Sequence, residues 1–386
     1  WRDWSSDVCS SDLVPGLSAA APAGSVPENT DHAGEVTLLK GFEVWLSAAR
    51  GGERSTAGVH VEGSSVAFGW ASGAAVVVPL ADVLAQGSAA AVWLAAPGSA
   101  FCVYSTKAWC AAGPGAAAVP PALDVCAAAY VLAAGQTVPS LADAARIWAG
   151  MDLTEDAVQE SLFADDGANA QRCAAVAVAL ARAAGTLDAR LTAQEGLDLV
   201  RDMEIPVAAV LAEMEATGIA VDVESLRRLE AEFAAAAATI EAAAHDIAKT
   251  DFNLSSPKQL QEILFVVRGL PHTKRIKTGF STDVEALTWL AETTKDPLPQ
   301  TLLDYREVSR LRQTITGLIA SVRDDGRIHT TFQQFVAATG RLSSTEPNLQ
   351  NIPVRTDDGK RIRAAFVAGP GFESLLTADY SQIEMR

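Results

Sequence analysis

The sequence predicts an α/β domain, followed by a mainly helical region and then by a mostly irregular segment that closes on a strand. Short apolar runs separated by Gly and Ser fill residues 36 to about 100, which is the pattern of strands. Alanine-rich runs of helical length that end at glycine continue to about residue 190. From residue 194 apolar residues recur at helical spacing over longer runs. Strands followed by helices indicate one α/β domain ahead of a helical block.

The expected strands are VTLL, AGVHV, SVAFGW and AAVVVPL. The expected helices of the α/β domain are LDVCAAAYVLAAG (123–135), SLADAARIWAG (140–150) and QRCAAVAVALARAAG (171–185). Residues 1–35 are left out of the fold. WRDWSSDVCSSDL (1–13) resembles a translated sequencing adapter, and residues 14–35, rich in Ala, Gly, Pro and Ser, predict a disordered lead-in.

The helical block begins with two helices between residues 194 and 250, linked around Gly218–Asp222. A further helix starts at Ser256 as N-cap, with Pro257 at its first position. Then follow a basic loop (271–280), two helices (283–294 and 299–323) and a mostly irregular stretch from 340 that ends in the strand SLLTADY (374–380).

The composition is that of a globular protein: 386 residues with 49% hydrophobic content are enough for two or three buried cores. A net charge of -17 argues by itself against a nucleic-acid partner, but a local basic strip would suffice for a DNA groove. The five cysteines include no C-x-x-C pair, so we expect a reducing cytoplasm rather than a disulfide framework. No apolar run reaches the roughly 18 residues of a membrane span, and we expect no membrane association.

The most informative passage is TGRLSSTEPNLQNIPVRTDDGKRIRAAFVAGPGFESLLTADYSQIEMR (339–386). A strand that rises to an aspartate and turns directly into a helix presents a carboxylate for a metal ion, and Asp379 occupies that position. The alternative is a plain helix start, because Ser381 and Glu384 have the S-x-x-E spacing of a capping box. The residues alone leave both interpretations open.

TGRLSSTEPNLQNIP together with DYSQIEMR resembles the first palm block of family A DNA polymerases of the bacterial DNA polymerase I type. FNLSSPKQL (252–260), KTGFSTD (277–283) and DGRIHTTF (325–332) resemble the thumb and the approach to the palm of the same family. The resemblance implies an exonuclease-like domain of RNase H-like α/β fold at 36–193, a mainly helical thumb at 194–338, and the beginning of an α+β palm at 339–386. Met385 stands where leucine is usual, which is a volume-conserving exchange.

The implied activity is template-directed DNA synthesis in replication and repair, with nucleotides transferred to a primer 3'-hydroxyl. The implied partners are primer-template DNA and deoxynucleoside triphosphates, with two Mg²⁺ ions, in a cytoplasmic, nucleoid-associated monomer. By resemblance Asp379 is a ligand of both metal ions, the Tyr380 carbonyl is a further ligand, and Glu384 packs under the incoming sugar. Because the chain stops at Arg386, we expect a fragment whose metal site is unformed, with low order from about residue 370 and no nucleotide incorporation.

Two groups of residues are expected to contact DNA. By resemblance, Arg341 reaches the minor groove near the primer terminus, where every base pair offers an acceptor. Asn348, Gln350 and Asn351 resemble neighbouring donors to template and primer, with polar loop residues that satisfy backbone groups as the alternative. The remaining candidates are phosphate contacts of the thumb, with a solvated charged face as the alternative: Lys258, Lys274, Arg275 and Lys277.

The exonuclease-like domain has lost part of its expected acidic set. In VHVEG the Asp-x-Glu pair falls on His60 and Glu62, and CVYSTKAW (102–109) offers no acid. By resemblance, Asp124 and Asp166 match the remaining carboxylates, and Leu162 stands where an orienting tyrosine belongs. Two missing carboxylates leave too few oxygen ligands for a hard divalent pair. We therefore interpret the domain as a relic without proofreading activity, whose remaining acids are ordinary surface residues.

Two rival functions remain open at this point. One is a non-catalytic DNA-binding module built from exonuclease-like and thumb parts, which a natural stop after Arg386 would favour. The other is a 3'-5' exonuclease, which the missing acids disfavour.

Overall fold

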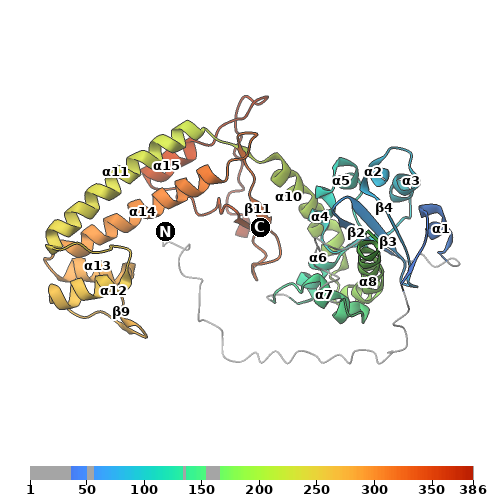
Figure 1. Ribbon diagram of the computed structural model, residues 1–386, viewed down its shortest axis with the longest axis horizontal. Coiled ribbons are helices and arrows are strands. Elements are labelled where there is room, and N and C mark those ends of the chain that lie inside the picture. Colours follow the sequence, from blue (N-terminus) through green and yellow to red (C-terminus); the bar gives the residue numbers. More distant parts are fainter. Residues whose placement is uncertain (1–35, 50–55, 134–135, 154–165, 386) are drawn as a thin grey trace.

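The structure is a computed structural model that describes residues 36–49, 56–133, 136–153 and 166–385 (Figure 1). The expectations for residues 1–35 and for Leu162 lie outside the described residues. A mixed sheet with its helices forms one end of the molecule, and a long helical arm extends from it toward the other end (Figure 1). Among the described helices, none is long and apolar enough to cross a membrane.

Six described strands form one sheet in the order β1-β4-β3-β2-β5-β6. β2, β3 and β4 are joined as antiparallel neighbours, whereas β5 and β6 run parallel to β2, and β1 runs parallel to β4. The four strands expected before residue 100 are confirmed, but β5 and β6 were missed because they are only three and two residues long. The bounds are β1 Thr37–Leu38, β2 Ala57–Glu62, β3 Ser65–Gly69, β4 Ala74–Pro79, β5 Phe101–Val103 and β6 Leu123–Asp124.

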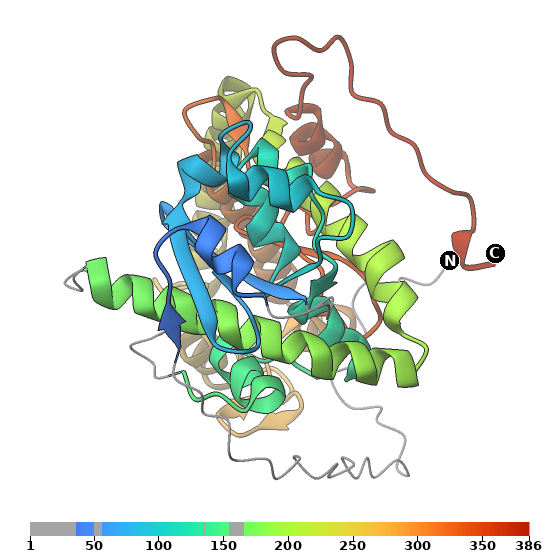
Figure 2. The same cartoon turned by 90° about the vertical axis from the view of Figure 1, so that its right-hand side faces the viewer.

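The helix α8, Asp166–Ala193, lies across the sheet in backbone contact with it (Figure 2). A Cβ added to Gly58 of β2 would lie 1.8 Å from the carbonyl oxygen of Ala177, and one added to Gly69 of β3 would lie 2.5 Å from the Val178 nitrogen. Only glycine therefore allows this close approach. We call the sheet, α8 and the shorter helices within residues 36–193 the sheet unit. Its shorter helices are α1 Phe42–Ser47, α2 Leu80–Leu84, α3 Ala89–Ala95, α4 Thr106–Ala111, α5 Pro114–Ala117, α6 Val125–Leu132, α7 Leu141–Ala144 and η1 Ala145–Ala149.

The helical pair expected between residues 194 and 250 is confirmed, with the link where it was expected. Gly218 ends the first helix with a φ of 60°, and the Asp222 carboxylate caps the second by accepting from the Ser225 N–H at 3.0 Å. The link itself contains a strand, β7, which pairs with β10. These elements are α9 Leu197–Leu199, η3 Val200–Glu204, α10 Ile205–Thr217, β7 Ile219–Ala220, α11 Val223–Ala248 and β10 Arg327–Ile328.

The arm consists of α11 packed against α14, with a small helical tip at the end far from the sheet (Figure 1). Leu260, Leu264, Leu287 and Leu290 fill the core of this tip. The basic loop expected at 271–280 is in part a two-stranded hairpin, β8 and β9. The bounds are α12 Pro257–Gln261, η4 Glu262–Val267, β8 Arg275–Ile276, β9 Gly279–Phe280, α13 Val284–Thr293 and α14 Leu298–Ala320.

The helix after Ser256 begins where it was expected, with Pro257 in its first turn. The Ser256 side chain, however, makes no capping hydrogen bond. Proline itself explains this start, because it lacks the N–H that a cap would satisfy and its ring fixes a helical φ.

Residues 331–385 differ from the expectation in two places: they contain a helix that was not expected, and they lack a strand that was. A helix at Asp357–Ala364 was missed, although Thr356 caps it and acids in its first turn and arginines in its last suit the helix dipole. The strand expected at 374–380 is wrong: these residues are exposed and form no strand. A strand needs a hydrogen-bonded neighbour, and the part of the chain that the structure describes places none beside them. The elements are β11 Thr331–Gln333, β12 Ser343–Thr345, α15 Asp357–Ala364 and η5 Ile383–Met385.

Candidate functional site

Four of the residues expected to contact DNA lie on either side of β12: Arg341 precedes this strand, and Asn348, Gln350 and Asn351 follow it. Arg341 is exposed and lies two residues before the start of β12, which pairs with β11. The Asn348 side-chain oxygen accepts from the Gln350 N–H at 2.9 Å, and Gln350 Nε2 donates to the Leu342 carbonyl at 3.1 Å. These two side chains therefore make hydrogen bonds to the backbone of their own segment. Asn351 is exposed.

The residues expected at the metal site lie on an extended chain. Asp379 and Tyr380 are exposed, and Figure 2 shows the segment before the C-terminus running away from the rest of the molecule. η5 is a single 3-10 turn, so the capping-box interpretation of Ser381 and Glu384 finds no α-helix to cap. The Glu384 side chain lies outside the described residues.

The fit of Asp379 to a magnesium pair is incomplete. Its carboxylate and the Tyr380 carbonyl are hard oxygen ligands of the type that Mg²⁺ prefers. Within the described ranges, however, Asp379 belongs to no group of three or more acidic, histidine or cysteine side chains whose ligand atoms come within 4.8 Å. The described residues thus offer oxygen atoms of a suitable type at this place but do not assemble a two-metal site.

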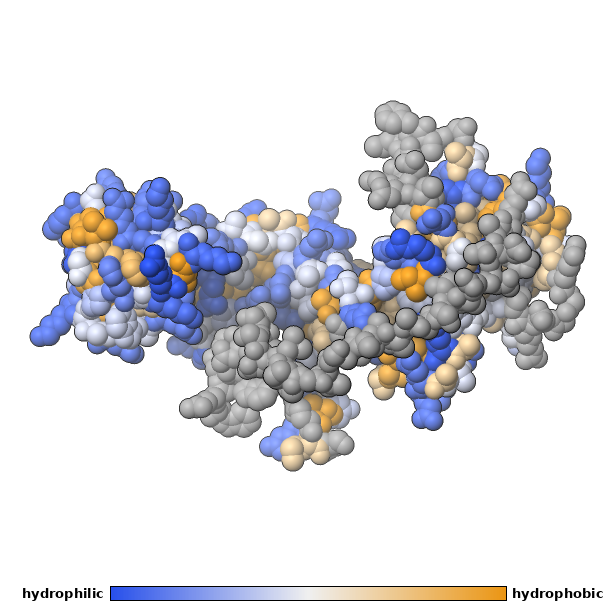
Figure 3. Space-filling view, turned by 90° about the horizontal axis from the view of Figure 1, so that it is seen from below, coloured by the Kyte–Doolittle hydropathy of each residue, from blue (hydrophilic) through white to orange (hydrophobic). Residues whose placement is uncertain are grey.

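The four basic residues expected to contact DNA phosphates lie on the elements at the far end of the arm. Lys258 lies on α12, Lys274 and Arg275 lie on or beside β8, and Lys277 lies in the turn between β8 and β9. All four are exposed at the tip of the arm, and we call them the basic tip. Figure 3 shows strongly hydrophilic residues projecting from this end of the molecule.

Contacts that the sequence did not indicate hold the hairpin of the basic tip against α12. The Gln261 side-chain oxygen accepts from the Phe280 N–H at 3.0 Å, and a Cβ on Gly279 would lie 1.9 Å from that oxygen. His272 stacks on Phe280 with 4.1 Å between ring centroids. Arg268, directly after η4, forms an ion pair with Asp296 inside the arm. The hairpin is therefore a positioned element with exposed cations.

Glu62 is not an ordinary surface acid, so that expectation is wrong. Its Oε2 lies 3.5 Å from His60 Nε2 and accepts from the Cys173 thiol at 3.1 Å, and its other oxygen is paired with Arg172. Burial lowers the pKa of His60. Burial, with the hydrogen bond to Glu62, raises the pKa of the Cys173 thiol to about 12.

Asp124 is also not a surface acid, because its side chain is buried at the start of α6. One carboxylate oxygen accepts from the Thr106 N–H at 2.5 Å and the other accepts from the Ala127 N–H at 2.9 Å. Burial raises the pKa of Asp124. The residue therefore caps α6 and ties it to α4, with its oxygens committed to backbone groups. Asp166 begins α8, and its side chain lies outside the described residues.

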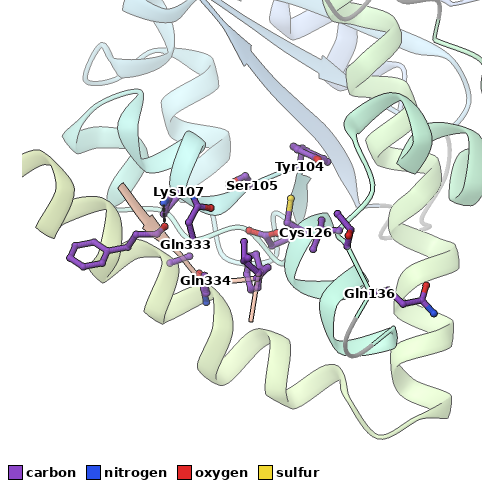
Figure 4. A pocket seen from close by; sticks show the side chains of 14 residues that line it. Tyr104, Ser105, Lys107, Cys126, Gln136, Gln333 and Gln334 are labelled. Atoms are coloured by element: carbon purple, nitrogen blue, oxygen red, sulfur yellow. Dashed lines mark hydrogen bonds between the residues drawn. The ribbon is translucent and has the colours of Figure 1, made fainter. Parts of the chain in front are cut away.

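A cavity of about 390 Å³ lies where the sheet unit meets the chain just after β11 (Figure 4). Lys107 Nζ lies 2.6 Å from Glu215 Oε1 of α10 and donates to the Phe332 carbonyl at 2.5 Å. The same carboxylate oxygen accepts from the Phe332 N–H at 2.6 Å. Gln334 is buried and donates to Glu204. These contacts join the two halves of the molecule, and no local motif in the sequence indicates them.

The comparisons with known proteins agree on one family. The family model for DNA polymerase family A matches residues 223–386. DNA polymerase I of Mycobacterium bovis is 40% identical over 385 residues, covering 95% of this chain and 43% of the relative. DNA polymerase I of Lactococcus lactis subsp. cremoris is 46% identical over 209 residues, covering 54% of this chain and 23% of the relative. The chain thus spans less than half the length of these relatives.

A solved structure is similar over most of the chain. It is the POL domain of Pol1 from M. smegmatis in complex with DNA primer-template and dNTP. The two share 40% sequence identity and a TM-score of 0.78, covering 90% of this chain and 61% of that chain. Similarity in sequence and in fold across nearly the whole chain shows that it belongs to DNA polymerase family A.

Proposed function

We propose that this chain supplies the primer-template grip and the first metal-binding carboxylate of a template-directed DNA polymerase of replication and repair. The observation that carries the proposal is the 40% identity over 95% of the chain to proteins named DNA polymerase I. The similar solved structure, by its title, binds DNA primer-template and dNTP. The same two ligands are proposed for the whole protein to which this chain contributes, acting as a monomer in the cytoplasm.

The proposed division of labour follows the architecture. Residues 36–193 form an exonuclease-like domain, and the mixed sheet under α8 supports its RNase H-like α/β character. Residues 194–338 contain the thumb, and the long α11–α14 pair with its basic tip supports this role. Residues 339–386 begin the palm. The antiparallel pair β11–β12 joins the last two regions.

The basic tip is proposed to contact DNA phosphates. Its four cations are exposed, and the two elements that carry them, α12 and the hairpin, are in contact, so they place positive charge at one end of the arm despite the net charge of -17. Arg341 and Asn351, both exposed, are proposed to face primer and template. Asn348 and Gln350 are proposed to act at the same place by shaping the loop that carries these two residues.

Asp379 and Tyr380 are proposed as ligands of the divalent ions that support nucleotidyl transfer, and Glu384 as the residue under the incoming sugar. Mg²⁺, when bound, would lower the cost of the charge that develops on the reacting oxygens. The described residues do not complete that site, so no step of the reaction is assigned to them here. Glu62 and Asp124 are proposed to have no proofreading role. The neighbours of Glu62 are Cys173 and Arg172 and not further acids, and both oxygens of Asp124 accept from backbone N–H groups.

The test is duplex binding by the 386-residue chain, followed as fluorescence anisotropy of a labelled primer-template. We expect saturable binding that is independent of sequence and falls steeply as salt is raised. Asp379→Ala should leave this binding unchanged, because phosphate contacts at the arm do not involve Asp379. Absence of binding at low salt in a folded sample would overturn the proposed grip.

A further inference from the structure

Strand geometry places two potential metal ligands on the face of β2 that α8 covers. Side chains two residues apart on a strand point to the same face, so Gly58, His60 and Glu62 share one. Gly58 marks this face, since its missing Cβ leaves room for the Ala177 carbonyl of α8. His60 and Glu62 therefore point toward the helix and away from the aromatic core on the other side.

The helix supplies a third potential ligand. Cys173 lies one helical turn before Ala177, the residue that contacts Gly58. Its thiol lies 3.1 Å from Glu62 Oε2, which in turn lies 3.5 Å from His60 Nε2. Ligand atoms of all three residues lie within 4.8 Å of one another. Ligands of a tetrahedral zinc ion are separated by roughly 3.3 to 3.8 Å, given its bond lengths of about 2.0 to 2.3 Å. Small side-chain shifts would therefore bring the three ligand atoms to the separations that a zinc ion requires.

A neighbouring residue already orients the carboxylate. Arg172 pairs with Glu62 Oε1 and leaves Oε2 facing His60 and Cys173. Metal-binding carboxylates commonly have their second oxygen held in this way by an outer hydrogen bond. The side chains of His60 and Glu62 are each 18% exposed, so solvent can supply a fourth ligand.

We propose that His60, Glu62 and Cys173 form a zinc site that pins α8 to β2. A thiolate and an imidazole favour zinc over magnesium, which prefers oxygen ligands alone. On binding, the Cys173 thiol loses its proton to solvent and the thiolate, the imidazole nitrogen, Glu62 Oε2 and one water surround the ion. This site is independent of the proposed polymerase function, since it lies in the sheet unit far along the chain from residues 339–386.

The experiment is titration of the full chain with Co²⁺, which takes the same ligands as zinc and gives a thiolate charge-transfer band in the near ultraviolet. A Cys9→Ser background removes the cysteine of the first 35 residues. We expect one equivalent of Co²⁺ to produce the band and one equivalent of Zn²⁺ to abolish it. Cys173→Ala should eliminate the band, and His60→Ala and Glu62→Gln should each weaken Co²⁺ binding at least about tenfold.

Cys110→Ala is the matched control, because this cysteine is also buried in the sheet unit but lies in a different core cluster. It should retain the band. Thermal unfolding provides a second measurement: Zn²⁺ should raise the melting temperature of the parent chain and of Cys110→Ala, but not that of Cys173→Ala. A folded parent chain without the band, or a band that survives Cys173→Ala, would overturn the proposal.

Discussion

Lys107 Nζ lies 2.6 Å from Glu215 Oε1, and this ion pair joins α4 of the sheet unit to α10. Both side chains are largely buried, with 21% and 23% of their surface exposed. The same carboxylate oxygen also accepts from the Phe332 N–H. One carboxylate therefore holds three segments that are far apart in the sequence: the first turn of α4, the end of α10 and β11.

Glu215→Ala should destabilise the chain by about 1 to 3 kcal/mol, because it leaves the Lys107 ammonium and the Phe332 N–H without this acceptor in a partly buried place. Urea unfolding followed by circular dichroism measures the change. Glu213→Ala, an exposed position on the same helix, is the control and should change stability by no more than about 0.5 kcal/mol. Equal effects of the two variants would contradict the role assigned to Glu215.

Asp124 should make stability depend on pH. Because burial raises its pKa, the folded chain holds the Asp124 proton more tightly than the unfolded chain does. The stability that this provides is fully present below the unfolded-state pKa of about 3.9 and is lost as pH rises through the raised folded-state pKa. Relative to Asp124→Asn, the parent chain should therefore lose unfolding free energy as pH rises from about 4.

Urea unfolding of both proteins at several pH values between about 4 and 7 measures this difference. The exposed Asp82→Asn provides the control, and its difference from the parent should stay flat. Asp124→Ala, which removes both acceptors of backbone N–H groups, should be less stable by about 1 to 3 kcal/mol throughout. If the unfolding free energies of the parent and of Asp124→Asn change with pH in parallel, the buried carboxylate is not the source of the pH dependence.

Charge reversal at the hairpin of the basic tip should weaken duplex binding. The triple variant Lys274→Glu, Arg275→Glu and Lys277→Glu should bind at least about tenfold more weakly, and its salt dependence should fall by a slope of about 3, since three phosphate contacts are lost. The control is Lys40→Glu, Arg146→Glu and Arg190→Glu in the sheet unit, which changes the net charge equally. If both variants lose the same affinity, general charge and not the basic tip governs binding.

This 386-residue chain should not incorporate nucleotides on a primed template with Mg²⁺. The reason is that Asp379 is exposed and has no cluster of further ligands among the described residues, while two-metal catalysis needs at least a second carboxylate. Gel analysis of a labelled primer measures extension. In a longer protein that extends primers, Asp379→Ala should abolish synthesis and spare duplex binding. Extension by the 386-residue chain alone would show that the metal-site assignment is wrong.

The chain should not degrade a 3'-ended single strand with Mg²⁺ or Mn²⁺. His60 replaces an expected acid, so Glu62 has an imidazole, a thiol and a guanidinium beside it where a hard divalent pair needs further oxygen ligands. Both oxygens of Asp124 accept from backbone N–H groups. Release of labelled nucleotides measures degradation. Glu62→Gln is a better diagnostic than Asp124→Ala, because Asp124 also caps α6. Metal-dependent degradation that disappears in Glu62→Gln would refute the relic interpretation.

Local sequence patterns were enough to predict most of the helices and strands and the family. The strands before residue 100 and the long helices of the arm follow from local apolar spacing, which acts within a few residues. Gly218 and Asp222 mark the link between α10 and α11 through their own backbone and capping preferences. The motif blocks TGRLSSTEPNLQNIP and DYSQIEMR carried the family assignment that the comparisons support.

Which chemical groups meet depends on how the helices and the sheet pack, and local patterns could not predict it. Glu62 and Cys173 are 111 residues apart, and Lys107 and Glu215 are 108 apart, so their contacts depend on how helices and sheet pack and not on local spacing. Glu62 and Asp124, two of the acids expected to be surface residues, have buried or partly buried partners for the same reason. The strand expected at 374–380 is absent for a related reason. Its apolar pattern is local, but a strand forms only where a neighbouring strand completes its hydrogen bonds.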